Sequence, residues 1–415
     1  MDLNRFFLAA KAAVPAVASL SDACRGNALH AVADAVDAQA DAVLAANAAD
    51  LARMDAADPK FDRLKLTRER LAGVAADMRR VAELPSPLGK TIAETTRPNG
   101  LKIRKISVPF GVVGVIYEAR PNVTLDVFGL CLKSGNVCLL KGARDAAETN
   151  AALAEIVRAA LRRCGVPADA CVLLPPEREA ATALLRAVGN VDLVVPRGSR
   201  ALIDFVRENA RVPVIETGAG VCHVFLDTSA DLKKARDIVL NAKTRRVSVC
   251  NALDCVLVHE GLCGKIGEIF APLADFRVRI FADEKIRAAL AGTYPAELLE
   301  SAAEESFGTE FLDYKMSARV VPDLDAALAH IAAFGSKHSE CVVAEDERIC
   351  GRFLAEVDAA CVYANASTAF TDGGEFGFGA EVGISTQKLH ARGPMGLPEL
   401  TTYKYVVRGN GQIRA

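Results

Sequence analysis

One cysteine in the sequence stands where a reactive thiol could form. Cys250 follows a polar run with three basic residues, and small residues flank it. The basic residues are Lys243, Arg245 and Arg246. Nearby positive charge or a helix N-terminus can hold a thiol as the nucleophilic thiolate. For any cysteine, the alternative to a catalytic role is a structural role in the core. Cys255 is the other candidate nucleophile nearby, but its apolar neighbours would keep its thiol neutral.

Two further stretches could hold a nucleotide, although neither carries a standard glycine fingerprint. No G-x-G-x-x-G follows the first buried strand, and no G-x-x-x-x-G-K-[ST] phosphate loop occurs. The Gly198-Ser199 turn leads from a strand into a helix expected at 201–209, whose N-terminus could bind phosphate. Lys141 closes another strand, at the edge where ligands sit in open α/β sheets. Each signal is weak alone, because an ordinary turn or a solvated lysine would look the same.

The elements that must position these residues alternate between strands and helices. Short apolar runs predict strands at 111–116, 137–140, 191–195, 212–215 and 223–226. Helical patterns lie between them at 146–163 and 180–188. Alternating buried strands and helices predict a parallel sheet with helices on both faces. The pattern resumes beyond Cys250 at 277–280, 317–321 and 341–343, which predicts a second α/β domain.

The two ends of the chain predict a helical cover and a ribbon. Residues 1 to about 85 are rich in alanine with helical spacing, and Pro85 stops the last helix. After the Asn99-Gly100 turn, residues 101–108 largely alternate apolar with polar side chains. Such an exposed ribbon invites pairing with another subunit or with the far end of its own chain. Residues 401–407 are the counterpart we expect.

Composition limits the class of protein. The chain has 415 residues, of which 51% are hydrophobic and 25% charged, as in a globular protein of two or three domains. Its net charge of -2 lacks the basic excess that binding to nucleic acid or to a membrane surface requires. The 12 cysteines stand singly, with no C-x-x-C pair and no Cys/His spacing that suits zinc. From the cysteines we therefore expect no bound metal and a reducing location, the cytoplasm. No apolar run is long enough to span a membrane, and the N-terminus lacks the layout of a signal peptide.

Taken jointly, these stretches resemble the aldehyde dehydrogenase superfamily and, within it, the gamma-glutamyl phosphate reductase family. The resemblance covers nearly the whole chain, and it is strongest at 108–124, 132–142, 216–223, the Cys250 run, 335–340 and 383–396. This superfamily binds its dinucleotide without the usual glycine fingerprint, which would explain why none is found. The resemblance implies an aldehyde-dehydrogenase-like α/β fold with two doubly wound parallel-sheet domains and a small β-ribbon oligomerisation arm.

The resemblance also implies roles for single residues. Cys250 matches the nucleophile, and Asn122 matches an asparagine that helps to form the oxyanion hole. Lys141 matches the lysine that contacts the adenine ribose. Gly198 and Ser199 match the turn beside the pyrophosphate.

Positive side chains near these motifs are the expected partners for phosphate and carboxylate groups. Arg144, close to Lys141, could meet the 2′-phosphate of NADP. The expected substrate-binding residues are Arg120, Arg245 and Arg392, with Arg246 and Lys388 as further candidates. Any of them could equally belong to a structural ion pair.

The same resemblance implies a domain organisation. Residues 1–225 would form the NADP-binding domain, with the ribbon 97–109 in the oligomerisation arm. Residues 226–390 would form the catalytic domain that carries Cys250, and 391–415 the C-terminal return and arm strand.

The implied reaction is the NADPH-dependent reduction of L-glutamate 5-phosphate to L-glutamate 5-semialdehyde, the second step of L-proline biosynthesis. It releases phosphate and passes through a thioester on the cysteine. The implied partners are this small-molecule substrate and further copies of the chain in a homo-oligomer. A functional coupling to glutamate 5-kinase is also implied.

One residue does not suit a phosphate-releasing reductase. Glu216 occupies the slot in which hydrolytic aldehyde dehydrogenases activate water against the thioester, so either a hydrolytic enzyme or a structural role for Glu216 stays open. A cofactor-free cysteine hydrolase would require a histidine partner, which the sequence cannot place beside Cys250. A catalytically inactive binding relative is disfavoured because Cys250, Asn122 and Lys141 are all present.

Overall fold

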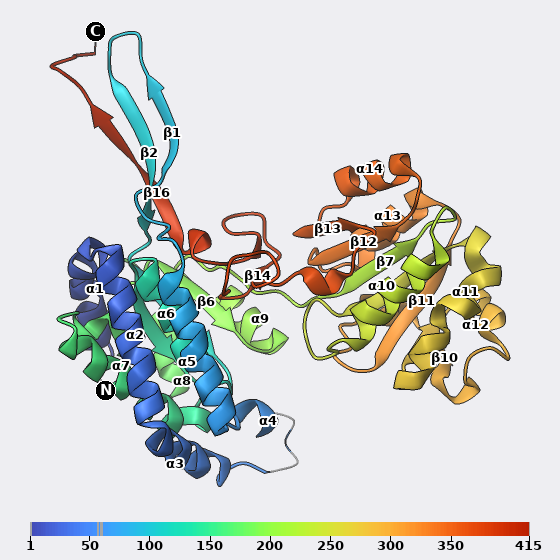
Figure 1. Ribbon diagram of the computed structural model, residues 1–415, viewed down its shortest axis with the longest axis horizontal. Helices are drawn as coiled ribbons and strands as arrows, with labels where there is room; N and C mark the ends of the chain where they lie inside the picture. Colours follow the sequence, from blue (N-terminus) through green and yellow to red (C-terminus); the bar gives the residue numbers. More distant parts are fainter. Residues whose placement is uncertain (1, 56–57, 59–60, 415) are drawn as a thin grey trace. The chain divides into compact units, whose positions relative to one another are not determined.

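The computed structural model describes residues 2–55, 58 and 61–414 and divides into two compact units (Figure 1). Unit 1 comprises Met1–Thr217, Gly377–Gly383 and Met395–Ala415, and unit 2 comprises Gly218–Phe376 and Ile384–Pro394. Within the described residues, every helix is too short or too polar to cross a lipid bilayer.

Unit 1 is built on a four-stranded parallel sheet in the order β5-β4-β3-β6. Its strands are β3 (Val112–Tyr117), β4 (Val137–Lys141), β5 (Cys171–Leu173) and β6 (Leu193–Arg197). The helices of this region are α6 (Val123–Lys133), α7 (Ala147–Arg163), α8 (Arg178–Leu185) and α9 (Arg200–Asn209). The strand predicted at 212–215 is wrong: only an isolated bridge joins Val194 to Val214. Pro213 lacks the N–H that a regular ladder requires.

The first 85 residues form the predicted helical cover of unit 1. They contain α1 (Asn4–Ser19), α2 (Asp22–Ala38), α3 (Ala40–Leu51), α4 (Phe61–Leu64) and α5 (Arg68–Glu83). The side chains of Ser21 and Thr67 cap α2 and α5 by accepting backbone hydrogen bonds. Figure 1 shows these helices in blue beside α6 and α7.

The predicted ribbon is confirmed, and it pairs with the far end of its own chain. β1 (Thr91–Thr96), β2 (Lys102–Pro109) and β16 (Thr401–Arg408) form an antiparallel sheet in that order. The register between β2 and β16 runs without a break from the Pro109–Thr401 pair to the Lys102–Arg408 pair. Figure 1 shows this arm extending away from the helices of the same unit.

Unit 2 contains a seven-stranded parallel sheet in the order β10-β9-β11-β8-β7-β12-β13. Its strands are β7 (Cys222–Leu226), β8 (Leu253–His259), β9 (Arg279–Ala282), β10 (Leu299–Ser301), β11 (Lys315–Val321), β12 (Ser339–Val343) and β13 (Cys361–Ala364). One apolar cluster joins the sheet to α10 (Leu232–Thr244), α11 (Ile266–Phe270) and α12 (Glu284–Leu290). A second cluster joins it to α13 (Leu324–Phe334) and α14 (Glu347–Glu356). The predicted doubly wound α/β fold is confirmed.

The boundary between the units lies at Thr217 and Gly218. Strand β7, which the sequence placed at the end of the first domain, pairs instead with β8 and β12 of unit 2. Periodicity identifies a buried strand but cannot show which sheet it joins. Residues 384–390, expected in the catalytic domain, lie in unit 2, and so do 391–394, which were expected in the C-terminal return. This stretch contains the short pair β14 (Ile384–Ser385) and β15 (Gly393–Pro394).

Candidate active site

Cys250 lies in the turn between α10 and β8 of unit 2, and it is partly exposed. α10 ends at Thr244, so the end of this helix that is nearest to Cys250 along the chain is its C-terminus. Arg245 and Arg246 are exposed at the start of this turn. They are the members of the basic run that an approaching anion can reach.

Lys243, the third basic residue of the run, points into the core of unit 2. Its Nζ donates to the carbonyl oxygen of Leu253 at 2.8 Å and lies 3.7 Å from Asp254 Oδ1. Burial lowers the pKa of Lys243, although Asp254 opposes this change. Burial raises the pKa of Asp254 to about 7, although Lys243 opposes it. Lys243 therefore stabilises the base of the turn instead of supplying charge to an exposed thiol.

The backbone of Cys250 packs directly against the segment that leads into β7. A Cβ placed on Gly220 would lie 1.6 Å from the carbonyl oxygen of Cys250. The Cys222 thiol donates to the same oxygen at 3.2 Å. The N–H of Gly220 donates to Glu310 Oε1 at 2.9 Å. Only a residue without a side chain permits this approach, so Gly220 is part of what places Cys250.

Asn251 anchors the other side of the same turn. Its Nδ2 donates to the carbonyl oxygens of Thr371 at 2.9 Å and Ala369 at 3.3 Å. Thr368 Oγ1 donates back to the carbonyl oxygen of Asn251 at 2.8 Å. The turn is therefore held by hydrogen bonds at the cysteine itself and at the residue that follows it.

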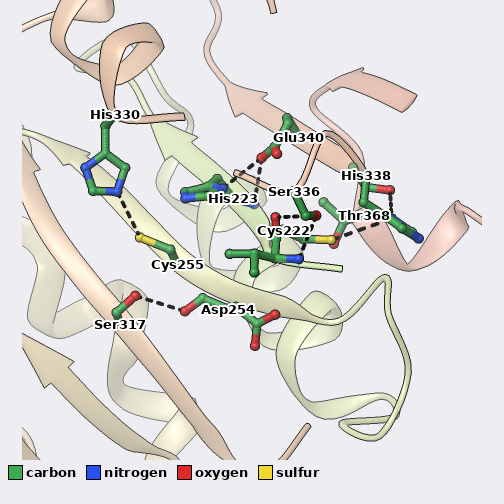
Figure 2. A network of polar contacts seen from close by, with 12 residues as sticks. Cys222, His223, Asp254, Cys255, Ser317, His330, Ser336, His338, Glu340 and Thr368 are labelled. Atoms are coloured by element: carbon green, nitrogen blue, oxygen red, sulfur yellow. Dashed lines mark hydrogen bonds and ion pairs between the residues drawn. The ribbon is translucent and has the colours of Figure 1, made fainter. Parts of the chain in front are cut away.

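A buried histidine lies beside Cys222, the residue whose thiol bonds to the backbone of this turn (Figure 2). His338 Nδ1 lies 2.8 Å from Ser339 Oγ and 3.8 Å from Cys222 Sγ. Ser339 Oγ in turn lies 2.6 Å from Thr371 Oγ1. Burial lowers the pKa of His338 to about 4, so its ring is neutral near pH 7. A neutral ring contributes no positive charge to the thiolate.

Asn122 stands at the N-cap position of α6 in unit 1, but its side chain makes no capping hydrogen bond and is held by Asp126 instead. Its Nδ2 donates to Asp126 Oδ2 at 2.8 Å. Burial raises the pKa of Asp126 to about 6, while the bond from Asn122 and the charge of Arg197 lower it. Asp126 is therefore ionised near pH 7 and accepts this bond. A carboxamide carries two N–H donors, so the contact orients the amide and leaves one donor for a ligand.

Lys141 ends β4 and is buried at the sheet edge where the sequence placed it. Its Nζ donates to the carbonyl oxygens of Gly142 at 2.8 Å and Pro176 at 3.2 Å. Burial lowers the pKa of Lys141, and the charge of Arg144 acts in the same direction. An ammonium group has three donors, so one N–H can still meet a hydroxyl. Arg144 itself is exposed.

A cavity of about 230 Å³ lies beside Lys141 in the same unit. It is lined by Phe6, Gly142, Ala143, Ala147, Asn150, Ala151, Leu173, Leu174, Pro175 and Pro176. Two of these residues supply the carbonyls that hold the lysine. Mostly apolar walls with a few polar groups at one edge suit a flat ring that carries a sugar.

A carboxylate occupies the helix end where the resemblance places the pyrophosphate. The N–H and Oγ of Ser199 donate to Glu118 at 2.7 and 2.8 Å. A Cβ on Gly198 would lie 2.7 Å from the same carboxyl group. A phosphate binding at this end of α9 has to share these donors with Glu118 or displace it. Sequence reasoning missed Glu118, although its place directly after β3 put it at the ligand edge of the sheet.

The expected substrate-binding arginines differ in their surroundings. Arg120, in unit 1, and Arg245, in unit 2, are exposed. Arg392 Nη2 lies 2.8 Å from Asp358 Oδ1, and Lys388 and Lys337 lie 3.0 and 3.4 Å from the other oxygen of this carboxylate. These hydrogen bonds, first that of Arg392, hold the pKa of Asp358 well below its usual range. A substrate anion would compete with Asp358 for this group of cations.

Glu216 also has a structural partner in unit 1. Its carboxylate lies 2.6 Å from Arg207 Nη2 and 3.1 and 3.2 Å from Arg207 Nε. The two-point contact orients the carboxylate toward α9. It favours the structural alternative that the sequence left open for this residue.

Comparisons with known proteins agree with these motifs. A sequence profile of the aldehyde dehydrogenase family matches residues 1–277. The gamma-glutamyl phosphate reductase of Parabacteroides distasonis is 59% identical over 414 residues, which cover 100% of both chains. That of Bacteroides thetaiotaomicron is 57% identical over 413 residues, covering 100% of this chain and 99% of the relative.

Solved structures extend the likeness to the fold. The crystal structure of gamma-glutamyl phosphate reductase from Thermotoga maritima superposes with a TM-score of 0.96 at 38% identity, covering 100% of both chains. An acetylating aldehyde dehydrogenase from Geobacillus thermoglucosidasius has a TM-score of 0.70 at 16% identity, covering 100% of this chain and 98% of that chain. At that identity the second likeness concerns the fold alone.

Proposed function

The chain belongs to the gamma-glutamyl phosphate reductases of the aldehyde dehydrogenase family, and on that premise we propose that it reduces L-glutamate 5-phosphate to L-glutamate 5-semialdehyde. This reaction releases phosphate and is the second step of L-proline biosynthesis. The observation that carries the proposal is the end-to-end match, at 59% identity, to a relative of that name. The enzyme is an oxidoreductase that uses a nicotinamide cofactor.

The residues of the chain suit a covalent mechanism. The thiolate of Cys250 attacks the acyl phosphate carbon, and phosphate leaves with the electron pair of the broken C–O bond, so that a thioester remains. The backbone N–H of Cys250 and the second N–H of Asn122 stabilise the developing oxyanion, at about 3 kcal/mol per donor. A bound nicotinamide dinucleotide supplies the hydride that reduces the thioester carbon. Release of the aldehyde then returns the thiolate.

The cofactor is NADPH in this proposal, held by residues of unit 1. The cavity beside Lys141 fits an adenosine group in size and polarity, and the remaining N–H of Lys141 would meet a ribose hydroxyl. Gly198 and Ser199 would lie beside the pyrophosphate, with Glu118 displaced or sharing their donors. Arg144 is exposed near Lys141 and would pair with the 2′-phosphate.

The reverse reaction tests the function directly. Oxidation of the semialdehyde, supplied as its equilibrium mixture with pyrroline-5-carboxylate, should require inorganic phosphate as the acceptor of the acyl group. We expect the rate of NADP⁺ reduction to fall at least about tenfold without phosphate, as expected when a step loses its nucleophile. Formation of free glutamate at the same rate in phosphate-free buffer would identify a hydrolytic dehydrogenase and contradict the proposal.

Asn122→Ala should slow the chemical step more than it weakens cofactor binding. Loss of one oxyanion donor predicts a fall in kcat of about 10²-fold, and the dissociation constant of NADPH should stay within about twofold of the wild-type value. Single-turnover kinetics with fluorescence titration of NADPH separates the two quantities. A variant that lost only cofactor affinity would show that Asn122 has no part in the oxyanion hole.

Arg144→Ala should impair NADPH more than NADH. Removing one cation from the 2′-phosphate predicts a rise of about tenfold in the KM for NADPH, with little change for NADH. Arg162→Ala is the matched control, because Arg162 is also an exposed arginine of unit 1 but pairs with Glu155. An unchanged ratio of the two KM values in the Arg144 variant would dismiss its role in selectivity.

We also propose a cytoplasmic homo-oligomer that is coupled to glutamate 5-kinase. All 12 cysteines are free, which suits a reducing compartment. The arm exposes Ile92, Tyr403, Tyr405 and Val407, which are apolar enough to pack against another copy. The substrate is a labile acyl phosphate, so its direct supply by the kinase would limit its loss to water.

A further inference from the structure

A row of polar side chains crosses the core of unit 2, on the sheet face that α13 covers. Glu340 of β12 pairs in register with His223 of β7, and His223 pairs with Cys255 of β8. Side chains at paired positions point to the same face of a sheet. All three have no solvent-exposed surface. Burying such groups in an apolar cluster costs free energy unless they have partners.

Glu340 fixes the orientation of His223. One carboxylate oxygen, Oε2, accepts from His223 Nδ1 at 3.0 Å and from the backbone N–H of His223 at 2.8 Å. The proton of a neutral ring is thereby placed on Nδ1, and Nε2 presents its lone pair. That Nε2 is buried and makes no hydrogen bond within the described residues. A carboxylate on one ring nitrogen and a bare second nitrogen are typical of histidines that bind a metal.

Two more donor atoms converge on the same point (Figure 2). His330 of α13 places its Nε2 3.7 Å from Cys255 Sγ. The rings of His330 and His223 meet edge to face, with their centroids 5.5 Å apart. Ligand atoms of His223, Cys255 and His330 all lie within 4.8 Å of one another. A tetrahedral zinc ion, with bonds of about 2.0 Å to nitrogen and 2.3 Å to sulfur, separates two nitrogen ligands by about 3.3 Å and a nitrogen from a sulfur ligand by about 3.5 Å.

We propose that His223 Nε2, Cys255 Sγ and His330 Nε2 bind a zinc ion in the core of unit 2. Two imidazole nitrogens and a thiolate are borderline to soft donors, which suit Zn²⁺ and disfavour Mg²⁺ and Ca²⁺. The charges of the thiolate and of Glu340 balance that of the ion, so the buried group is neutral as a whole. Three protein ligands leave the fourth position to a small ligand such as water. The ion ties α13 to β7 and β8.

The positive charge of Arg319 weakens metal binding at this site. Its Nη1 lies 3.4 Å from His330 Nδ1, and its guanidinium stacks on Phe307 at 5.1 Å. When Nε2 of His330 binds a metal, the ring proton moves to Nδ1 and faces this cation. Arg319 is partly exposed, so it can turn toward solvent and keep its stem on the aromatic ring. Removing its charge should therefore tighten metal binding.

The spacings of cysteine and histidine along the chain do not indicate this group of ligands, and from those spacings we expected no metal. The three ligands come from two strands and a helix that are far apart along the chain. Spacing rules detect ligands that share one loop or one helix. Only strand register brings His223 and Cys255 side by side.

Cobalt binding to the purified full-length protein tests the proposal. Protein freed of metal with a chelator is equilibrated with Co²⁺, and the thiolate-to-cobalt charge-transfer absorption is recorded. We expect saturation at about one equivalent per chain and displacement by Zn²⁺. Cys255→Ser should abolish the absorption band, and His330→Gln should weaken Co²⁺ binding. Glu340→Gln should weaken binding by about 10- to 100-fold, as expected when the carboxylate partner of a ligating histidine is lost.

Two variants separate this site from the other thiols and charges. Cys250→Ser should retain the band, because its thiol is not a ligand of the site, and Arg319→Gln should tighten Co²⁺ binding. Circular dichroism and the midpoint of thermal unfolding show that each variant folds, and Zn²⁺ should raise that midpoint in the wild type but not in Cys255→Ser. A folded wild-type protein without the band would overturn the proposal. So would a band that survives Cys255→Ser and disappears in Cys250→Ser.

Discussion

Cys250→Ala should abolish phosphate-dependent turnover in both directions while the protein stays folded. The thiol forms and releases the only covalent bond to substrate in the proposed mechanism, so its loss predicts a fall in kcat of at least about 10⁴-fold. Cys250 is partly exposed in a turn held through backbone atoms and neighbouring residues. Removing its sulfur should therefore change the free energy of unfolding by less than about 1 kcal/mol.

The measurement is the NADP⁺-dependent assay with purified variant, together with a urea unfolding curve. Cys263→Ser serves as the matched control, because Cys263 is also a partly exposed cysteine of unit 2 but lies in the short 3₁₀ helix Glu260–Lys265, which follows β8. It should keep nearly full activity. More than a few per cent of wild-type activity in Cys250→Ala would show that another group is the nucleophile.

Gly220→Ala should reduce kcat by about 10²- to 10³-fold, because it displaces the turn that carries Cys250. The added Cβ would lie 1.6, 2.4 and 2.7 Å from the carbonyl oxygen, carbonyl carbon and Cα of Cys250. All three are backbone atoms, so the clash cannot be relieved by rotating a side chain. A shift of about 1 Å at a reacting group can cost about 10²-fold in rate.

Binding of NADPH should be nearly unchanged in this variant, since Lys141 and Ser199 belong to unit 1. Gly351→Ala is the control: a Cβ there meets no atom within 4 Å, and the residue lies inside α14. That substitution should leave kcat unaltered. If Gly220→Ala also kept kcat within about twofold, the close packing between Gly220 and Cys250 would have no importance for catalysis.

The sequence predicted those strands whose apolar period and flanking turn residues are visible in the segment itself. The apolar runs at β3, β4 and β11 and the alternating ribbon at β2 lie where period and turn residues placed them. The failure at 212–215 has a local cause as well, since Pro213 cannot donate to a ladder. The membership of β7 in the sheet of unit 2 had no local signal, because it depends on pairing with β8 and β12.

The candidate site also has one part that the sequence predicted and one part that it did not. The sequence marked Cys250, Asn122 and Lys141 through residue type and motif. It could not show that Glu118 binds Ser199 or that Asp126 orients the amide of Asn122. Such contacts depend on side-chain directions and on distances between elements, which no spacing along the chain encodes.

The pairing of β2 with β16 sets an order of events for the newly made chain. β2 leaves the ribosome long before β16, at a rate of about 5–20 residues per second. One edge of the hairpin formed by β1 and β2 therefore stays without its neighbour until the last residues have been translated. During that interval of roughly tens of seconds, the open edge offers a template for strands of other chains. A chain that terminates before β16 keeps the unpaired edge of β2 permanently, whereas in the 415-residue chain β16 pairs with that edge.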